Sequence, residues 1–432
     1  MPLHTRGVYL QRRTYQIPHA DVDDVFLRTC DSPANVETRI RAETWPKWSL
    51  TADGLLGTSR AVEGGCPSVV DYLHDAATGE HCIVLFAILV RGILRATMAS
   101  NNGLKIVFGS MTIGKPGTLG ARVHDLDTAS QIIDVFRNHG HNEIDFARVY
   151  GYGSSEEMLA GIGWQSRGIV MDTKLYPTAG GPMDPGNGYT HKPEDIRRGL
   201  LDSLKALGCE KIDMFYLHGP DRKTPFEDTL REVNKLHQED YFRRLGISNY
   251  MSWELAQICD ICRHNGWIQP TVYQGIYHAL QRRVEDELLP CLRYYGIALY
   301  AFQPLAGGFL TGRYSRDQTE YEPGSRFDPK IMQGKLHRGR YWNDTYFDAL
   351  DAIKEVSQKR GLAIAEVALR WLKHHSQLSE AKGDAIIVGA SSVKHLEENL
   401  VDLEKGPLPE EIVDIIESVW PTVKGLAPKY WH

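Results

Sequence analysis

Residues 212–218, Ile-Asp-Met-Phe-Tyr-Leu-His, decide the fold of this chain. They form a short apolar run that ends in a polar residue, which is typical of a buried strand with a functional side chain at its end. Three further segments follow this plan or turn polar just past the strand: 143–150 (Glu-Ile-Asp-Phe-Ala-Arg-Val-Tyr), 170–174 (Val-Met-Asp-Thr-Lys) and 245–249 (Leu-Gly-Ile-Ser-Asn). Polar residues so far apart in sequence can meet only at the ends of neighbouring parallel strands, and this requirement favours a barrel.

From Leu104 onward the chain alternates strand-like apolar runs with helical stretches. The expected strands are Lys105–Met111, Glu143–Ala147, Ile169–Leu175, Ile212–His218, Arg243–Asn249, Thr271–Tyr277, Ile297–Leu305 and Ala385–Ala390. The expected helices are Asp127–His139, Glu156–Ile162, Pro193–Leu207, Pro225–Gln238, Ser252–Asn265, Val284–Tyr295, Tyr346–Lys359 and Ile364–His374. Eight such units over about 300 residues predict a (β/α)8, or TIM, barrel. The competing doubly wound sheet requires a Gly-x-Gly-x-x-Gly turn after its first strand, and Gly151-Tyr-Gly153 lacks the third glycine.

The first 97 residues differ from the rest because they show mixed polarity, no sustained period and scattered Gly and Pro. We therefore expect two parts, residues 1–97 as a poorly structured N-terminal extension with a short helix around 82–96, and residues 98–432 as the barrel. The alternative is that Met98 is the natural start. The apolar run Cys82–Val90 is too short for a membrane span, which needs about 20 apolar residues, and it lies too far into the chain for an ordinary secretory signal.

The composition narrows the class of function. The 432 residues are 42% hydrophobic and carry a net charge of −6, which is typical of a soluble globular protein and gives no reason to expect nucleic-acid binding. Seven cysteines, odd in number and irregularly spaced, indicate reduced thiols and a cytoplasmic location. Cys259-Asp-Ile-Cys262 has CxxC spacing but no second pair, so helix packing is favoured over metal binding. We expect neither a membrane nor a nucleic acid as partner.

Asp145, Tyr150, Lys174 and His218 together suit the reduction of a carbonyl group. That reaction needs a hydride, which a nicotinamide supplies, and a proton from a positioned acid. A free tyrosine titrates at about pH 10, and a neighbouring ammonium lowers that pKa because it favours the phenolate. We expect Tyr150 to donate the proton, Lys174 to lower its pKa, and Asp145 to hold the lysine charged. His218 is expected to place the substrate oxygen. Taken singly, an Asp or a Lys at a strand end more often forms a salt bridge.

Several longer motifs point to one family. They are Glu143-Ile-Asp with Tyr150 and Ser155-Glu156, Phe215-Tyr-Leu-His-Gly-Pro-Asp221, Leu245-Gly-Ile-Ser-Asn-Tyr250, Pro270-Thr-Val-Tyr-Gln-Gly275, Pro304-Leu-Ala-Gly-Gly-Phe-Leu-Thr-Gly312, His374-His-Ser-Gln377 and Gly406-Pro-Leu408. With these motifs, residues 104–432 resemble the aldo-keto reductases, and specifically family 7, the aflatoxin-aldehyde and succinic-semialdehyde reductases. The resemblance implies a catalytic tetrad of Asp145, Tyr150, Lys174 and His218, with Tyr150 as proton donor. It also implies NADPH bound without a Rossmann domain, a small-molecule carbonyl substrate, and a homodimer.

The same resemblance implies where the nicotinamide half of the cofactor binds. Ser248 and Asn249 would hydrogen-bond the carboxamide, and Gln274 would lie beside them. Tyr300 or a close neighbour would stack on the nicotinamide face. The residues that would wrap the pyrophosphate are Gln303, Pro304, Leu305, Ala306, Gly307, Gly308, Leu310, Gly312 and Arg313. Their glycines allow close backbone approach, although Gly307-Gly308 taken alone indicates a tight turn.

The adenosine end would be held by a second segment. The residues implied are Ser391, Ser392, Glu398 and Asn399. Two adjacent serines at a helix start are otherwise an ordinary N-cap. A 2′-phosphate also requires a cation, and the sequence does not choose between Arg313, Arg326 and Lys394.

Substrate contacts are implied in the long segment Thr311–Thr345, which is rich in Arg, Gly and Tyr. Arg340 matches the family arginine that meets substrate carboxylates, and an arginine can grip a carboxylate with two parallel hydrogen bonds. The alternative is a solvated loop charge.

Four departures from the family pattern put acidic-substrate specificity in doubt more than catalysis. They are Phe146 in place of the usual Thr, His337 in place of a tyrosine that contacts substrate, the longer Gly/Pro loop at 175–188, and Lys429–His432 in place of an arginine.

These patterns predict an NADPH-dependent reductase that converts aldehydes or ketones to alcohols. One alternative is a biosynthetic reductase that acts on the carbonyl of a secondary metabolite. The other is a non-catalytic, nicotinamide-binding barrel that serves as a regulatory, channel-associated subunit. Multiple turnovers of NADPH oxidation would favour the enzyme over the regulatory barrel.

Overall fold

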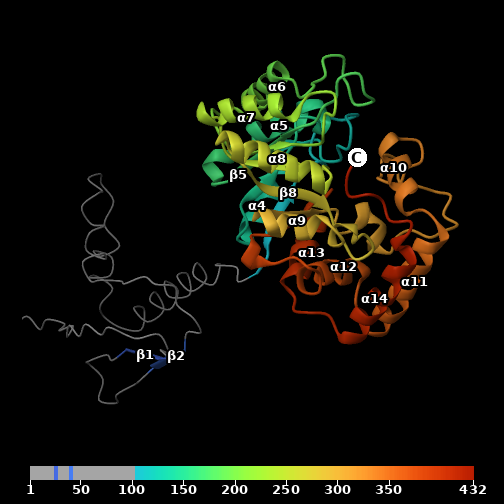
Figure 1. Cartoon of the computed structure of the whole chain (residues 1–432). Helices are drawn as coiled ribbons and strands as arrows, with labels where there is room; N and C mark the ends of the chain where they lie inside the picture. The colour runs from blue at the N-terminus through green and yellow to red at the C-terminus, as the bar shows by residue number, and fades with distance from the viewer. Residues whose placement is uncertain (1–23, 28–37, 42–102) are drawn as a thin grey trace, which may run out of the picture. The chain divides into compact units, whose positions relative to one another are not determined.

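The computed structural model describes residues 24–27, 38–41 and 103–432 (Figure 1). Near the N-terminus, strands β1 (Asp24–Leu27) and β2 (Thr38–Arg41) pair in antiparallel register. Within the described residues, all further elements lie between Lys105 and Lys424.

The chain divides into two units, Met1–Leu94 and Arg95–His432. The domain boundary expected after residue 97 and the helix expected at 82–96 lie outside the described residues. They therefore stay predictions, as does the poor order expected of residues 1–97.

Eight parallel strands of the second unit close into a barrel in the order β10-β3-β4-β5-β6-β7-β8-β9. Their bounds are β3 (Lys105–Gly109), β4 (Glu143–Asp145), β5 (Val170–Leu175), β6 (Ile212–Leu217), β7 (Phe242–Ser248), β8 (Pro270–Ile276), β9 (Ala298–Phe302) and β10 (Ala385–Val388). Each strand pairs with its neighbour in sequence, and β10 closes the ring against β3. The predicted TIM barrel is confirmed.

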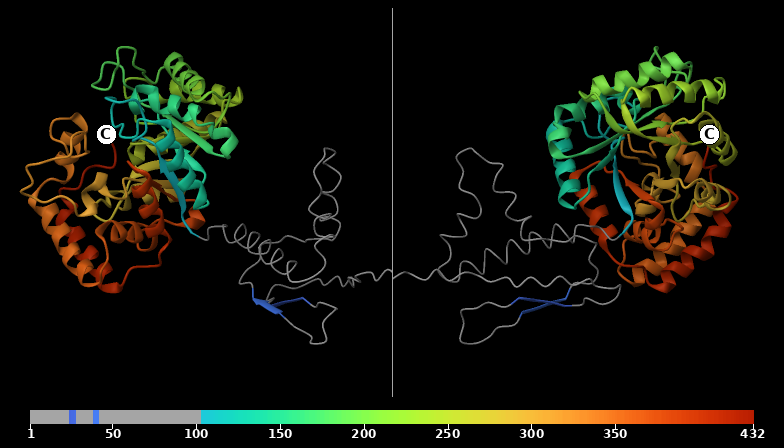
Figure 2. Two further views of the ribbon diagram at one scale, coloured as in Figure 1. Left: turned by 180° about the vertical axis from the view of Figure 1, so that it is seen from behind. Right: turned by 60° about the vertical axis from the view of Figure 1, so that its left-hand side comes forward.

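Helices surround the barrel, as the two views in Figure 2 show. Their bounds are α4 (Leu126–Asn138), α5 (Ser154–Gly161), α6 (Pro193–Leu207), α7 (Phe226–Gln238), α8 (Ser252–Asn265), α9 (Leu288–Tyr295), α10 (Met332–Tyr341), α11 (Asp344–Lys359), α12 (Ile364–His374), α13 (Val393–Glu404) and α14 (Glu410–Lys424). Local signals explain several ends. The Asp125 carboxylate caps α4 by accepting from the Thr128 amide, and Pro193 opens α6, which stops at Gly208 in the left-handed conformation.

The helices pack on the outer face of the sheet through one large apolar core, and a smaller cluster fills the barrel interior. The interior cluster consists of Val107, Met214, Tyr216, Val272, Ala298, Tyr300, Ala385 and Ile387. Phe146 belongs to the outer core and is fully buried there. Its ring therefore lies behind the sheet and does not line the site.

Helix α10 interrupts a segment that the sequence presented as one long loop. Three buried side chains, Gln333, His337 and Tyr341, recur every four residues and anchor the helix. Gly334 is required between them because a Cβ there would lie 1.7 Å from the carbonyl oxygen of Asp328. The Arg and Gly content of the segment obscured this period, so the helix was not predicted.

The described helices include none that is both long enough and apolar enough to cross a membrane.

Candidate active site

The carboxyl ends of neighbouring strands bring the predicted catalytic residues together. Asp145 ends β4, and its register partner on β5 is Asp172, two residues before Lys174. Lys174 is in register with Tyr216 of β6, and His218 directly follows that strand. Side chains two residues apart on a strand face the same side, so Asp172 and Lys174 both point into the barrel.

A buried ion pair forms the floor of the site. Lys174 Nζ donates to Asp145 Oδ2 over 2.5 Å and to the Phe146 carbonyl oxygen over 2.6 Å. Gln274 Nε2 donates to Asp145 Oδ1 over 2.8 Å, so both carboxylate oxygens have partners. Lys174 is fully buried, and its ammonium lies 5.0 Å from the centre of the Tyr150 ring. The structure thus places Gln274, predicted to lie beside the cofactor, in direct contact with Asp145.

The loop that carries Tyr150 is tied to the strand that carries Lys174. Tyr150 opens the 3-10 turn η2 (Tyr150–Gly153), which leads into α5. The buried Glu156 accepts a hydrogen bond from Thr173 Oγ1 over 2.6 Å and pairs with Arg148 on the other side of the turn. This double contact holds the tyrosine loop against β5, and it explains the glutamate of the Ser-Glu motif.

His218 lies between two tyrosine rings. Its ring centre is 5.8 Å from that of Tyr150 and 5.6 Å from that of Tyr176, edge-on in both cases. Burial, together with the nearby charge of Lys174, holds the pKa of His218 well below its ordinary value. The imidazole is therefore neutral at physiological pH, and one ring nitrogen can donate a hydrogen bond to a carbonyl oxygen.

Tyr176 and His432 are aromatic neighbours of the site that were not predicted as site residues. The His432 ring lies 5.6 Å from that of Tyr176, and its backbone carbonyl accepts from Arg222. The end of the chain, marked C in Figure 1, thus returns to the site. Both residues fall within segments that depart from the family pattern, and this was the available signal.

The charges of the site favour a protonated tyrosine beside a charged lysine. Burial raises the pKa of the Tyr150 phenol above its ordinary value, and the Lys174 charge opposes that rise without cancelling it. The predicted net lowering is therefore wrong in direction, because sequence alone does not show how deeply the hydroxyl lies. Burial also works against the Lys174 ammonium, but Asp145 and Tyr150 raise the pKa of Lys174 above its ordinary value. At neutral pH the phenol keeps the proton that it would donate.

Asp172 is a buried acid that sequence reasoning passed over. Neither of its carboxylate oxygens, nor the hydroxyl of the neighbouring Tyr216, has a hydrogen-bond partner among the residues that the structure describes. Burial raises the pKa of Asp172 well above its ordinary value; the negative charge of Glu143 adds to the rise, and Arg244 opposes it. The protonated, uncharged form of Asp172 is therefore favoured in the folded protein. Its position two residues before Lys174 was the signal for an inward-facing side chain.

We expect Asp172→Asn to stabilise the protein, increasingly so as the pH rises. Unfolded Asp titrates at about pH 3.9, while the folded-state pKa is raised. Above the unfolded pKa, folding must therefore take up a proton at Asp172. This costs roughly 1.4 kcal/mol per pH unit until the folded pKa is reached, and asparagine avoids that cost. Urea unfolding of parent and variant between about pH 4 and pH 8 measures the difference. A constant difference across this range, as expected for the exposed control Asp260→Asn, would contradict the assignment.

The residues predicted to hold the carboxamide lie at the end of β7. Asn249 has a φ of 65°, and its Nδ2 donates to the His218 carbonyl oxygen over 2.8 Å and to Ser248 Oγ over 3.0 Å. Both residues are almost fully buried. With Nδ2 committed to the protein, Asn249 Oδ1 is left to accept from a ligand amide.

The other predicted cofactor segments follow β9 and β10. The run after β9 forms the 3-10 turn η5 (Ala306–Thr311), with φ values of 70° at Gly307 and 106° at Gly308. The Ser392 hydroxyl caps α13 by accepting from the His395 amide over 3.2 Å, which confirms the N-cap interpretation for Ser392. Asn399 is buried on the same helix. Contact of these segments with a cofactor stays a prediction.

The three candidate phosphate-binding cations lie in different surroundings. Lys394 is in the first turn of α13, with Nζ 3.7 Å from a glutamate on the next turn. Arg313 donates to the Tyr314 hydroxyl over 2.6 Å. Arg326 is largely withdrawn from solvent, yet it has no hydrogen bond or ion pair within the described part of the chain; burial lowers its pKa, and its charge acts on Tyr150. A withdrawn arginine without a carboxylate partner is suited to a ligand anion.

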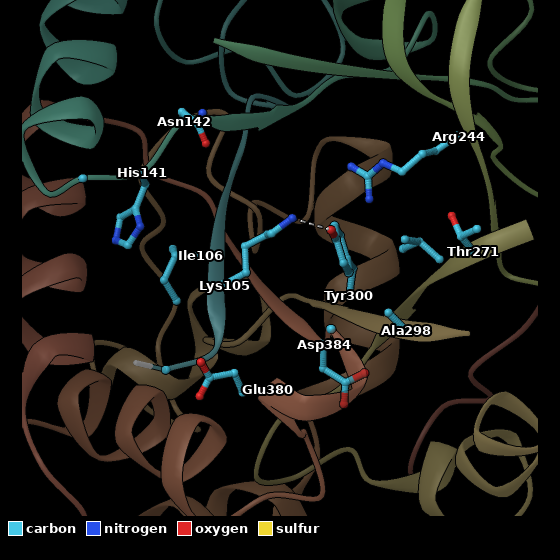
Figure 3. A pocket seen from close by; sticks show the side chains of 14 residues that line it. Lys105, Ile106, His141, Asn142, Arg244, Thr271, Ala298, Tyr300, Glu380 and Asp384 are labelled. Carbon is cyan, nitrogen blue, oxygen red and sulfur yellow. Dashed lines mark hydrogen bonds between the residues drawn. The ribbon is translucent and has the colours of Figure 1, made fainter. Parts of the chain in front are cut away.

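Tyr300 does not face the catalytic residues. Its hydroxyl accepts from Lys105 Nζ over 3.2 Å at the amino end of the barrel (Figure 3). There it lines a pocket of about 540 Å³ with Arg244 and Ala298. The prediction that Tyr300 stacks on the nicotinamide is wrong, because its side chain points toward the opposite mouth. The alternative of a close neighbour stays open for Phe302, which packs on the interior cluster nearer the carboxyl end.

The fold and the site define a class: a TIM-barrel enzyme with an acid–base set assembled at the carboxyl ends of its strands. Residues 105–421 match the family model described as "Aldo/keto reductase family", and the chain belongs to this family. It is 51% identical to aldo-keto reductase pigE of Monascus ruber over 331 residues, which cover 76% of this chain and 97% of that protein. It is 42% identical to human aldo-keto reductase family 7 member A3 over 335 residues, covering 76% and 96% of the two chains.

A solved structure with the same architecture is the glycerol dehydrogenase AKR11B4 from Gluconobacter oxydans. It matches with a TM-score of 0.56 and 26% sequence identity, covering 74% of this chain and 93% of that chain. Together, the comparisons confirm the resemblance to family 7. The protein is an oxidoreductase that acts on carbonyl groups, a reductase of aldehydes or ketones that works with a nicotinamide cofactor.

Proposed function

We propose that this protein reduces aldehydes or ketones to alcohols with NADPH, and that Tyr150 donates the proton. The observation that supports this most strongly is the buried Lys174–Asp145 pair, with the ammonium 5.0 Å from the centre of the Tyr150 ring. The protonated phenol of Tyr150, the fixed ammonium of Lys174 and the neutral imidazole of His218 then lie around one binding position. This position suits a carbonyl oxygen, which gains negative charge as it is reduced.

Each residue has a separate task in this reaction. When bound, the nicotinamide supplies the hydride. His218 donates a hydrogen bond to the carbonyl oxygen and fixes its position. Tyr150 transfers its hydroxyl proton to that oxygen as charge develops there. Lys174 stabilises the phenolate that Tyr150 becomes, and Asp145, held in turn by Gln274, keeps the ammonium in place.

The residues around the site fit a phosphate-bearing cofactor. Asn249 Oδ1 would accept from the carboxamide, and the turn after β9 would take the pyrophosphate. Arg326 acts on Tyr150 and so suits a phosphate near the nicotinamide end. Lys394 lies beside Ser392 at the other segment and suits the 2′-phosphate.

We expect Arg326→Met to weaken NADPH binding about 10- to 100-fold, because it removes a charge-assisted contact to phosphate. Quenching of protein fluorescence on titration with NADPH measures the dissociation constant. Arg316→Met is the matched control, since Arg316 pairs with Asp348 on the exposed surface. An unchanged dissociation constant for the Arg326 variant would remove this residue from the cofactor site.

The proposed activity is tested with a panel of aldehydes, ketones, dialdehydes and semialdehydes, each with NADPH and with NADH, read by absorbance. We expect many turnovers per enzyme with at least one simple aldehyde such as a nitrobenzaldehyde, and a preference for NADPH. NADPH binding without repeated turnover on any member would favour the regulatory-barrel alternative. The homodimer and the cytoplasmic location stay predictions, and light scattering of the purified protein tests the first.

A second candidate is the biosynthetic reductase, and the aromatic pair Tyr176 and His432 beside His218 favours it. Flat rings at the mouth of a site suit a carbonyl attached to a planar aromatic system. Arg340 argues the other way, because within the described residues it has neither hydrogen bond nor ion pair and so suits a carboxylate. The ratio of kcat/KM for a bicyclic aromatic aldehyde to that for succinic semialdehyde decides between the two.

A further inference from the structure

The turn after β9 is held in a backbone conformation that most residues avoid. Gln303 and Ala306 have φ values of 59° and 51°, and two glycines follow with positive φ. Left-handed backbone costs a non-glycine residue roughly 1–2 kcal/mol. Such strain persists only where the surroundings fix it. Contacts from outside the turn must therefore stabilise it. The side chain of Gln303 makes such contacts.

The Gln303 side chain joins a buried chain of hydrogen bonds. His278 Nδ1 accepts from the Leu280 amide over 3.3 Å, so its proton is on Nε2, which donates to the Tyr341 hydroxyl over 3.1 Å. The Tyr341 hydroxyl in turn donates to Gln303 Oε1 over 3.4 Å. One end of the Gln303 amide is thus tied to the segment that follows β8 and to the end of α10.

The other end of the Gln303 amide meets His337. His337 Nδ1 faces the Gln333 carbonyl oxygen at 2.9 Å and must carry the proton, because a carbonyl only accepts. Nε2 is then free to accept from Gln303 Nε2 at 3.5 Å. Burial and the charge of Arg326 lower the pKa of His337 to about 3, which keeps the ring neutral, and the bond to the Gln333 carbonyl oxygen fixes the tautomer. With these assignments, each hydrogen bond in the chain from His278 to Gln333 has one donor and one acceptor.

His337 also packs directly on the strained turn. A Cβ placed on Gly307 would lie 2.3 Å from His337 Cδ2, so the imidazole occupies the space that a side chain would take. His337 is 3% exposed. The residue expected at this position on family grounds was a tyrosine that contacts the substrate. In this chain the histidine is turned away from solvent and against the backbone of Gly307.

We propose that His337 and Tyr341 are positioning residues that clamp helix α10 onto the turn at Gln303–Gly308 and thereby pre-form the site for the cofactor pyrophosphate. The proposal rests on the proposed function, because it assigns this turn to the cofactor. It changes the role of α10: besides carrying Arg340 toward the substrate, the helix sets the affinity for the cofactor. A pre-formed site binds more tightly because less order is lost on binding.

The test measures NADPH affinity, turnover and stability separately in three variants. We expect His337→Leu, which keeps bulk but removes both ring nitrogens, to raise the NADPH dissociation constant roughly five- to tenfold. Tyr341→Phe should raise it by a similar factor, whereas His337→Gln, whose amide oxygen can accept from Gln303, should restore most of the affinity. We expect kcat at saturating NADPH and KM for the aldehyde to change less than about twofold. Leu336→Ala, an exposed neighbour on α10, is the control.

The possible results separate this clamp from other roles. If His337→Leu raises KM for the aldehyde and leaves NADPH affinity unchanged, His337 contacts substrate and the proposal is overturned. If all variants, including His337→Gln, lose affinity only in proportion to a lower unfolding temperature of the free protein, the network is merely structural and the proposal also falls. The parent protein is titrated first. Absence of NADPH binding there would refute the proposed function itself, before any variant is considered.

Discussion

Tyr150→Phe is expected to lower kcat by about 10²–10⁴-fold while NADPH still binds with nearly parental affinity. The substitution removes one oxygen atom and leaves the ring, so its edge-on contact with His218 persists. What is lost is the proton transfer to the substrate oxygen. A decrease of this size corresponds to about 3–5 kcal/mol in the activation barrier.

Steady-state rates with a reactive aldehyde and a fluorescence titration with NADPH measure the two effects. A uniform loss of both would indicate a distorted site. The control is Tyr152→Phe, two residues further along the same turn, where the side chain is 45% exposed; it should retain full activity. If the Tyr150 variant turns over any aldehyde at the parental rate, another group donates the proton.

The barrel and the convergence of Asp145, Tyr150, Lys174 and His218 at one mouth were predictable from sequence because both follow from local patterns. Short apolar runs fixed the strands, and parallel strands present their carboxyl ends at one mouth. A polar residue at a strand end, such as Lys174, could therefore be placed without knowledge of the packing. Asp145 lies in register next to the same strand, and the contact between the two residues confirms that placement.

Features that depend on burial or on the direction of a side chain could not be predicted in the same way. Tyr300 and Gln274 are register partners on adjacent strands, yet one points to the amino mouth and the other contacts Asp145. The pKa of Tyr150 is raised and not lowered because the depth of its hydroxyl outweighs the lysine charge. His337 was noted as a departure, but its role emerges only from its contact with Gly307. In each case the deciding feature is a burial or a contact that exists only in the folded chain.

Lys174→Met is expected to lose activity by a similar factor, about 10²–10⁴-fold, and also to destabilise the fold. Without the ammonium, the main influence that opposes burial is lost, so the pKa of Tyr150 rises further. Alcohol oxidation, the reverse reaction, needs the phenolate as base, so the rise of its rate with pH should shift to higher pH. The substitution also leaves the Asp145 carboxylate buried with Gln274 as its remaining partner. Removal of one member of a buried ion pair typically costs about 3–5 kcal/mol of stability.

These two losses have separate causes, and a second substitution separates them. In the double variant Lys174→Met with Asp145→Asn neither partner of the former ion pair leaves an unpaired charge, so the free energy of unfolding should return toward that of the parent. Turnover should not return, because the ammonium that stabilises the phenolate of Tyr150 and supports its proton transfer is still absent. Urea unfolding and steady-state rates of the parent, the single variants and the double variant measure the two effects. Recovery of activity together with stability would mean that Lys174 serves only to neutralise Asp145, and Tyr150 would then donate its proton without help from the lysine.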